Sequence, residues 1–166
     1  MPRHGPSGDA QFMSPTLGTI TFQRMFAEIE QYLRQSPEDT YKLIVGTDSQ
    51  SRENEVTFVS AIVVHRVGKG ARYFYQRRTL RPMSSLRQRI FYEASLSLTL
   101  AGRLAERLAQ SGYEQSNIEI HLDVGEHGET RELIREIVGM VAGSGFHARI
   151  KPESFGASTV ADKYTK

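Results

Sequence analysis

The chain has 166 residues, of which 39% are hydrophobic and 24% charged, and its formal net charge is +2. That length suits one domain with a sizeable core, and that composition is ordinary for a globular protein. The chain has no cysteine, which excludes disulfides and thiolate metal sites and leaves oxygen or imidazole ligands for any metal. The small net charge does not by itself indicate a nucleic-acid-binding protein. No apolar run approaches the roughly 20 residues that span a bilayer, so we expect a cytoplasmic protein without a membrane segment.

The N-terminal part of the chain divides into an arm and a helix. Residues 1–18 contain three prolines and three glycines among few large apolar side chains, so we expect a flexible arm there and a single domain over residues 19–166. A helix is expected from about Thr21 to Gln35, because apolar side chains recur at helical spacing and Pro37 follows shortly after.

Five strands are expected in the rest of the chain. The first three, at about 41–48, 55–66 and 71–80, are joined by short connections and so form an antiparallel meander. Helices at about 84–110 and 129–143 precede the strands at about 118–123 and 146–151, and residues 157–166 can form a short helix. The long helical connections allow strands four and five to lie parallel to strand one through right-handed crossovers. The predicted fold is α/β, a mixed five-stranded sheet with helices on both faces and an extra N-terminal helix.

Two aspartates end predicted strands. Asp48 follows the apolar first strand, and Asp123 ends the fourth. Ligands of open α/β sheets bind beyond the carboxyl ends of parallel strands, so both side chains are candidates for a site. The alternative is that each aspartate only stabilises a turn.

Two further acids lie on predicted helices. Glu93 interrupts an otherwise mostly apolar stripe of the long helix that begins at Leu86, and a buried glutamate needs an ionic or metal partner. The alternatives are a flanking residue that reaches water or a pair with Arg89. Asp162 lies on the short terminal helix, where an exposed helix-end acid is the plain alternative. Together, the strand-end and helix acids would form one negative pocket, and divalent cations would relieve their repulsion.

A basic cluster surrounds the start of the long helix. It is either a solvated surface or a contact for nucleic-acid phosphates. Tyr73 and Tyr75 alternate on the third strand and could stack on bases, although a half-buried strand explains them equally well. The members of the cluster are Arg77, Arg78, Arg81, Arg87 and Arg89.

Three segments resemble the YkuK-type family, a bacterial group of ribonuclease H-like proteins. They are Ile44-Val45-Gly46-Thr47-Asp48-Ser49-Gln50, His121-Leu122-Asp123-Val124-Gly125, and Ala157-Ser158-Thr159-Val160-Ala161-Asp162-Lys163-Tyr164-Thr165-Lys166. The order of the predicted elements is also similar to that of the ribonuclease H fold. The resemblance extends over about residues 19–166.

The resemblance implies a nuclease that hydrolyses phosphodiester bonds of RNA or DNA with two Mg²⁺ or Mn²⁺ ions. Asp48 would bridge both ions, Glu93 and Asp123 would complete one site, and Asp162 the other. No histidine lies between strand five and Asp162, where many ribonucleases H have a mobile one, so Lys163 or His127 would take the auxiliary role. The alternatives are a non-catalytic ribonuclease H-like module that binds nucleic acid or acts as a scaffold, and a hydrolase of small phosphate esters.

Overall fold

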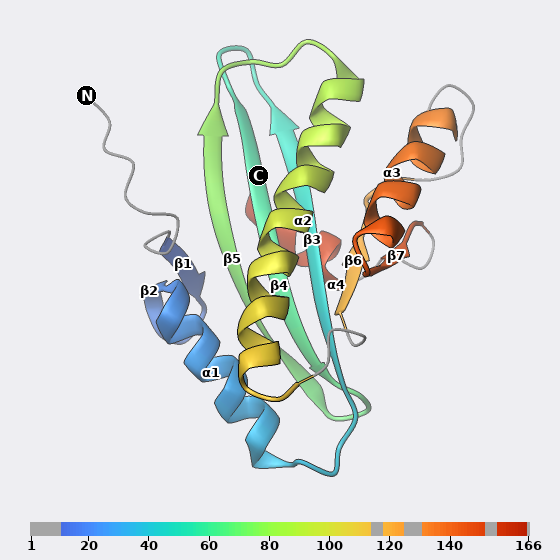
Figure 1. Cartoon of the computed structure of the whole chain (residues 1–166). Helices are drawn as coiled ribbons and strands as arrows, with labels where there is room; N and C mark the ends of the chain where they lie inside the picture. Colours follow the sequence, from blue (N-terminus) through green and yellow to red (C-terminus); the bar gives the residue numbers. More distant parts are fainter. Residues whose placement is uncertain (1–10, 114–117, 125–130, 152–155, 166) are drawn as a thin grey trace.

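The computed structural model describes residues 11–113, 118–124, 131–151 and 156–165, with the side chains of residues 156–159 and 162 outside that description (Figure 1). Helices α1 and α2 begin as expected. Thr21 accepts a hydrogen bond from the Arg24 amide, and Ser85 accepts one from the Gln88 amide, which is the usual side-chain capping of a helix start. The elements in chain order are β1 (Gln11–Ser14), β2 (Gly18–Thr21), α1 (Phe22–Gln35), β3 (Tyr41–Ser51), β4 (Val56–Arg66), β5 (Gly70–Leu80), α2 (Leu86–Gln110), β6 (Ile118–His121), α3 (Arg131–Gly143), β7 (His147–Arg149) and α4 (Gly156–Thr165).

The strands form one sheet in the order β2-β1-β5-β4-β3-β6-β7. Strands β3, β4 and β5 are antiparallel neighbours, and β6 pairs parallel with both β3 and β7. The predicted strand directions are therefore confirmed. Figure 1 shows that β3 and β5 consequently end at the same edge of the sheet, close to the start of α2.

The prediction of five strands is wrong, because the sheet has seven in the described part of the chain. The additional strands β1 and β2 form an antiparallel hairpin that meets β5 at the pair Met13 and Tyr75, so residues 11–18 of the expected arm include ordered strand. The Phe12 ring is fully buried and packs 5.9 Å from the Phe22 ring. Two four-residue strands with so few large apolar side chains give almost no alternation in the sequence, which is why the pattern missed them.

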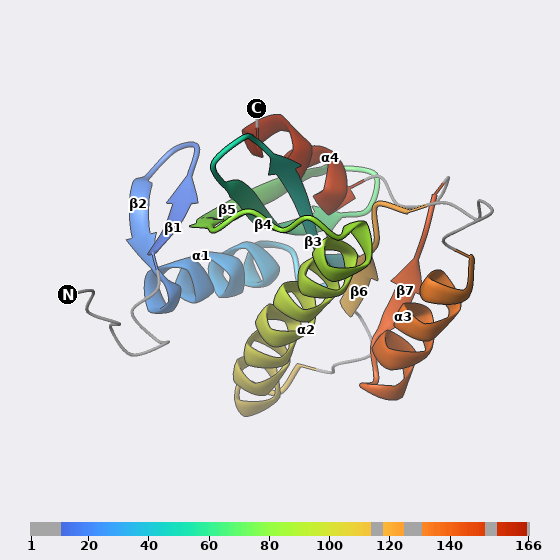
Figure 2. The same cartoon turned by 90° about the horizontal axis from the view of Figure 1, so that it is seen from above.

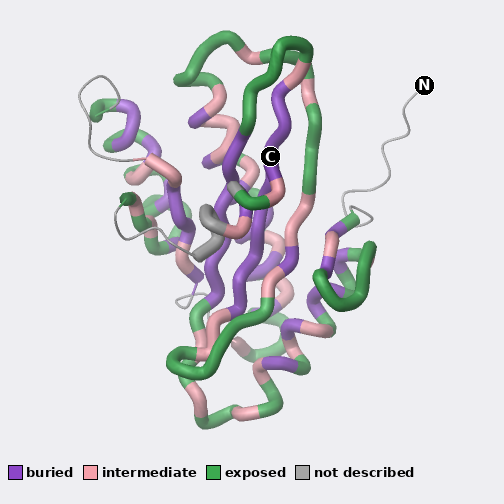
Figure 3. The backbone as a smooth tube through the Cα atoms, turned by 180° about the vertical axis from the view of Figure 1, so that it is seen from behind, coloured by how far each residue is buried: buried purple, intermediate pink, exposed green. Residues whose placement is uncertain are grey.

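Helices cover both faces of the sheet, as predicted. The large core lies on the face covered by α1, α2 and α3, and α4 lies alone on the opposite face of the described sheet (Figure 2). Ala161 of α4 packs there in a small cluster with Ile44 of β3 and Val59 of β4. Strands β3 and β4 are consequently buried over most of their length (Figure 3). None of the described helices is long and apolar enough to cross a membrane.

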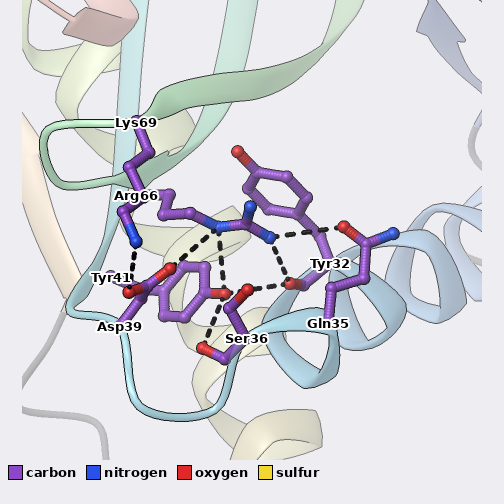
Figure 4. Close-up of polar contacts among 7 residues, drawn as sticks. All are labelled: Tyr32, Gln35, Ser36, Asp39, Tyr41, Arg66 and Lys69. Atoms are coloured by element: carbon purple, nitrogen blue, oxygen red, sulfur yellow. Dashed lines mark hydrogen bonds and ion pairs between the residues drawn. The ribbon is translucent and has the colours of Figure 1, made fainter.

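A polar network centred on Arg66 ties α1 to the sheet at the end where β3 begins (Figure 4). Arg66 donates hydrogen bonds to the Tyr41 hydroxyl at 3.1 Å and to the Tyr32 carbonyl at 3.3 Å, and its guanidinium lies 4.4 Å from the Tyr32 ring centroid. Asp39 pairs with Lys69 at 3.0 Å and lies 3.7 Å from Arg66. This end of the sheet is therefore held by its own ion pairs, and the candidate acids lie toward the other end of β3.

Candidate functional site

Asp48 and Asp123 lie at the same level on neighbouring parallel strands. The last paired residues of β3 and β6 are Gly46 and His121, and each aspartate follows two residues later. Asp48 is buried, with 8% of its surface exposed, whereas the Asp123 side chain is 27% exposed. Both aspartates therefore lie toward the same edge of the sheet. The prediction that Asp48 ends its strand is wrong, because β3 stays paired with β4 and continues to Ser51, whereas Asp123 lies two residues beyond β6.

Alternation along β3 sends neighbouring side chains to opposite faces of the sheet. Thr47 faces α2, because its hydroxyl lies 2.8 Å from the hydroxyl of Ser97 in that helix. Ser49 shares that face. Asp48 shares the opposite face with Ile44, which packs in the cluster that contains Ala161 of α4.

Glu93 reaches β3 from α2. Its Oε2 accepts a 2.5 Å hydrogen bond from the Ser49 hydroxyl. Arg89, one turn earlier on α2, donates to the same hydroxyl oxygen at 3.0 Å and to the Ser49 carbonyl at 3.2 Å. Ser49 thus lies between Glu93 and Arg89, whose direct pairing was one alternative for Glu93. The stripe of α2 that was expected to face the sheet is buried from Ile90 onward, whereas Leu86 at its start is 56% exposed.

Burial raises the pKa of Glu93 to about 8. The hydrogen bond from Ser49 lowers this pKa, the negative charges of Asp48 and Asp123 raise it, and the positive charge of Arg89 lowers it. Asp48 and Asp123 therefore lie near enough to Glu93 to oppose its ionisation. Glu93 and Asp123 also border one cavity of about 10 Å³.

The donor chemistry of these residues fits a hard divalent cation, because all three offer carboxylate oxygens and their charges repel. Among the residues that the structure describes, however, no three histidine, aspartate or glutamate side chains are arranged to hold a metal ion. Glu93 is bonded to Ser49, and Asp123 pairs with Lys151 at 3.0 Å. A cation would therefore bind carboxylates of which one oxygen already has a partner.

The remaining predicted site residues are only partly described. Asp162 belongs to α4, but its side chain lies outside the described residues, as does the whole of His127. Lys163 is exposed, and its ammonium nitrogen lies 5.5 Å from the Tyr164 ring centroid. The structure thus places Glu93 and Asp123 at one cavity and Asp48 near enough to raise the Glu93 pKa, and the four-residue site stays a prediction.

The predicted basic cluster lies on the second half of β5, on the segment that follows it, and on the first turns of α2. This is the edge at which β3 ends (Figure 1). Arg78 donates to the Tyr92 hydroxyl at 3.2 Å, and Arg87 pairs with Glu136 at 3.3 Å. Four of the five arginines, Arg77, Arg78, Arg81 and Arg87, are exposed, and Arg89 is half-buried against Ser49.

The sequence interpretation missed the partners of the acids, which are the Ser49 hydroxyl for Glu93 and Lys151 for Asp123. It also missed the neighbouring Thr47 hydroxyl, which lies 2.8 Å from the hydroxyls of Ser60 and Ser97. Thr47 and Ser49 flank Asp48, so strand alternation makes both side chains face the helix that carries Glu93 and Ser97. That alternation is the signal that could have found them.

The fold and the carboxylates define a ribonuclease H-like protein. A profile of the family described as Ribonuclease H-like matches residues 24–166, and the chain belongs to this family. It is 33% identical over 158 residues to a protein of Bacillus subtilis (strain 168) named "Uncharacterized protein YkuK", covering 89% of this chain and 92% of that relative. The resemblance to the YkuK-type group is therefore confirmed. No solved structure matches significantly. Family membership suggests a nuclease or a nucleic-acid-binding module.

Proposed function

We propose that this protein is a metal-dependent nuclease that hydrolyses phosphodiester bonds of RNA or DNA. The observation that carries the proposal is the electrostatic coupling of Glu93 to Asp48 and Asp123 at the carboxyl ends of two parallel strands. A buried glutamate whose ionisation is opposed by two neighbouring acids is costly unless it serves a site.

Asp48, Glu93 and Asp123, together with Asp162, would hold Mg²⁺ or Mn²⁺. When bound, two such ions supply an activated water and stabilise the leaving oxygen. Glu93 must release its proton before its carboxylate can serve as a ligand, because its pKa is about 8. Ser49 and Arg89 favour that ionised form. The exposed arginines of the basic cluster would contact substrate phosphates and so bring the nucleic-acid chain to the acids.

The test is cleavage of labelled RNA, DNA and RNA–DNA hybrid by the full chain with Mg²⁺ or Mn²⁺. We expect Asp48→Asn to abolish cleavage while the circular dichroism melt stays cooperative. Glu106→Gln, which neutralises an exposed acid on α2, is the matched control and should cleave normally. If the wild-type chain cleaves none of these substrates with either metal, the nuclease proposal fails.

The second candidate is a non-catalytic module that binds nucleic acid. The observation that favours it is that Glu93 and Asp123 are already bonded to Ser49 and Lys151. This candidate predicts nucleic-acid binding through the basic cluster that neither a chelator nor Asp48→Asn changes. A filter-binding or anisotropy titration with and without chelator separates the two candidates.

A further inference from the structure

Helix α4 depends on the sheet for its position. It has ten residues, and helices of that length are marginal on their own in water. Among its described side chains, Ala161 packs with a cluster of four buried side chains from β3 and β4, and Val160 and Tyr164 pack against that cluster. Polar and aromatic contacts add to this packing.

Three tyrosines, which we call the tyrosine clamp, hold α4 to β5. They are Tyr73 and Tyr75 of β5 and Tyr164 of α4. The rings of Tyr75 and Tyr164 stack with centroids 3.8 Å apart and planes 14° apart. The hydroxyls of Tyr73 and Tyr164 lie 2.7 Å apart, and this hydrogen bond is the main cause that raises the pKa of Tyr73 to about 12. Because Tyr164 covers one face of Tyr75, that face is not available to a nucleic-acid base.

Arg52 holds the last turn of the same helix. Its Nη2 donates a 3.1 Å hydrogen bond to the carbonyl of Thr165, a residue that is fully buried. Helix C-terminal carbonyls have no partner within the helix, so a guanidinium there satisfies one of them. Arg52 follows β3 directly, four positions after Asp48.

These contacts involve residues on either side of Asp162 in the chain and so locate its place in the helix relative to β3. Ala161 packs with Ile44, and Thr165 is bonded to Arg52, so the last turn of α4 lies along the part of β3 that contains Asp48. Asp48 shares the face that α4 covers. Asp162 occupies the helix position directly after Ala161.

We propose that the tyrosine clamp and Arg52 are positioning residues for Asp162, which set how α4 lies over β3 and thereby allow Asp162 to share a divalent cation with Asp48. This inference rests on the proposed function. None of the four residues needs to contact metal or substrate, so their effect acts through the helix. Residues that orient metal ligands in this way change metal affinity by roughly 10- to 100-fold.

The test compares Mn²⁺ binding by titration calorimetry in the full chain. We expect Tyr164→Ala to weaken Mn²⁺ binding by about tenfold or more and Tyr164→Phe, which retains the ring stack, to weaken it by less. Tyr113→Ala removes a partly buried ring from the large core on the other face of the sheet and is the matched control. Hydrogen exchange of α4 should speed up in Tyr164→Ala and not in the control.

A double mutant separates positioning from general destabilisation. In an Asp162→Asn background, Tyr164→Ala should cause no further loss of Mn²⁺ affinity, because the ligand that the clamp positions is already removed. A further loss of the same size would overturn the inference, as would wild-type affinity in Tyr164→Ala. If Tyr164→Ala does not fold, Arg52→Gln replaces it in the same cycle with the same outcomes. Failure of the wild-type chain to bind Mn²⁺ at all would instead overturn the proposed function.

Discussion

The Ser49 hydroxyl donates a 2.5 Å hydrogen bond to the Glu93 carboxylate, joining the end of β3 to the helix that crosses it. Arg89 donates to the same hydroxyl oxygen at 3.0 Å, so Ser49 lies between a guanidinium and a carboxyl group of one helix. This arrangement orients Glu93 beside Asp48 and Asp123. It also sets how readily Glu93 becomes the carboxylate that a cation needs.

Stability should depend on pH through Glu93. Its pKa is raised from 4.5 to about 8, so between these values the folded chain holds a proton that the unfolded chain has released. The contribution of Glu93 to the free energy of unfolding is therefore greatest below about pH 4.5 and falls as the pH rises to about 8, by on the order of a few kcal/mol. Urea unfolding at several pH values should show this decline in the wild-type chain and lose most of it in Glu93→Gln. An unchanged decline in Glu93→Gln would assign it to another group.

Ser49→Ala should destabilise the fold most where Glu93 is ionised. The substitution removes a donor that favours the carboxylate, so we expect the Glu93 pKa to rise further and the free energy of unfolding to fall by about 1–3 kcal/mol. Unfolding should be measured well below and well above pH 8, with exposed Ser95→Ala as the control. Equal losses at both pH values would show that the bond does not discriminate between the two forms of Glu93.

Lys151→Met should strengthen divalent-cation binding. Lys151 lies 3.0 Å from Asp123 and competes with any cation for that carboxylate, although its side chain is 58% exposed. We therefore expect severalfold tighter Mn²⁺ binding by calorimetry at low salt and a stability change below about 1 kcal/mol. Lys42→Met, which removes a similarly exposed lysine 3.7 Å from Glu119, should leave Mn²⁺ affinity unchanged. Weaker Mn²⁺ binding in Lys151→Met would contradict the competition.

The buried hydroxyls beneath the acids should act as a unit. Thr47 lies 2.8 Å from both Ser60 and Ser97, so Thr47→Val leaves two buried hydroxyls with one partner fewer. We expect a loss of about 2 kcal/mol in Thr47→Val and about 1 kcal/mol in Ser97→Ala, with the double mutant costing less than the sum. Chemical denaturation measures all three, and exposed Thr99→Val is the control. Strict additivity would show that the hydroxyls are independent.

Local signals predicted most of the fold correctly. Helix α1, the three long strands and the parallel placement of β6 and β7 all follow from helical spacing, strand alternation and the handedness of crossovers. The short hairpin of β1 and β2 was missed because it is held by tertiary contacts, such as the packing of Phe12 on Phe22, rather than by a pattern of its own.

Periodicity in the sequence was enough to place two aspartates near the ends of strands and one glutamate on a buried helical stripe, although β3 continues three residues past Asp48. Only the tertiary structure decided which groups these acids meet. Ser49 and Glu93 are 44 residues apart, and Tyr73 and Tyr164 are 91 apart. Such contacts depend on how whole helices and strands pack. Local backbone preferences do not specify that packing. The helix positions also decide that Tyr75 stacks on Tyr164 and that Asp123 pairs with Lys151.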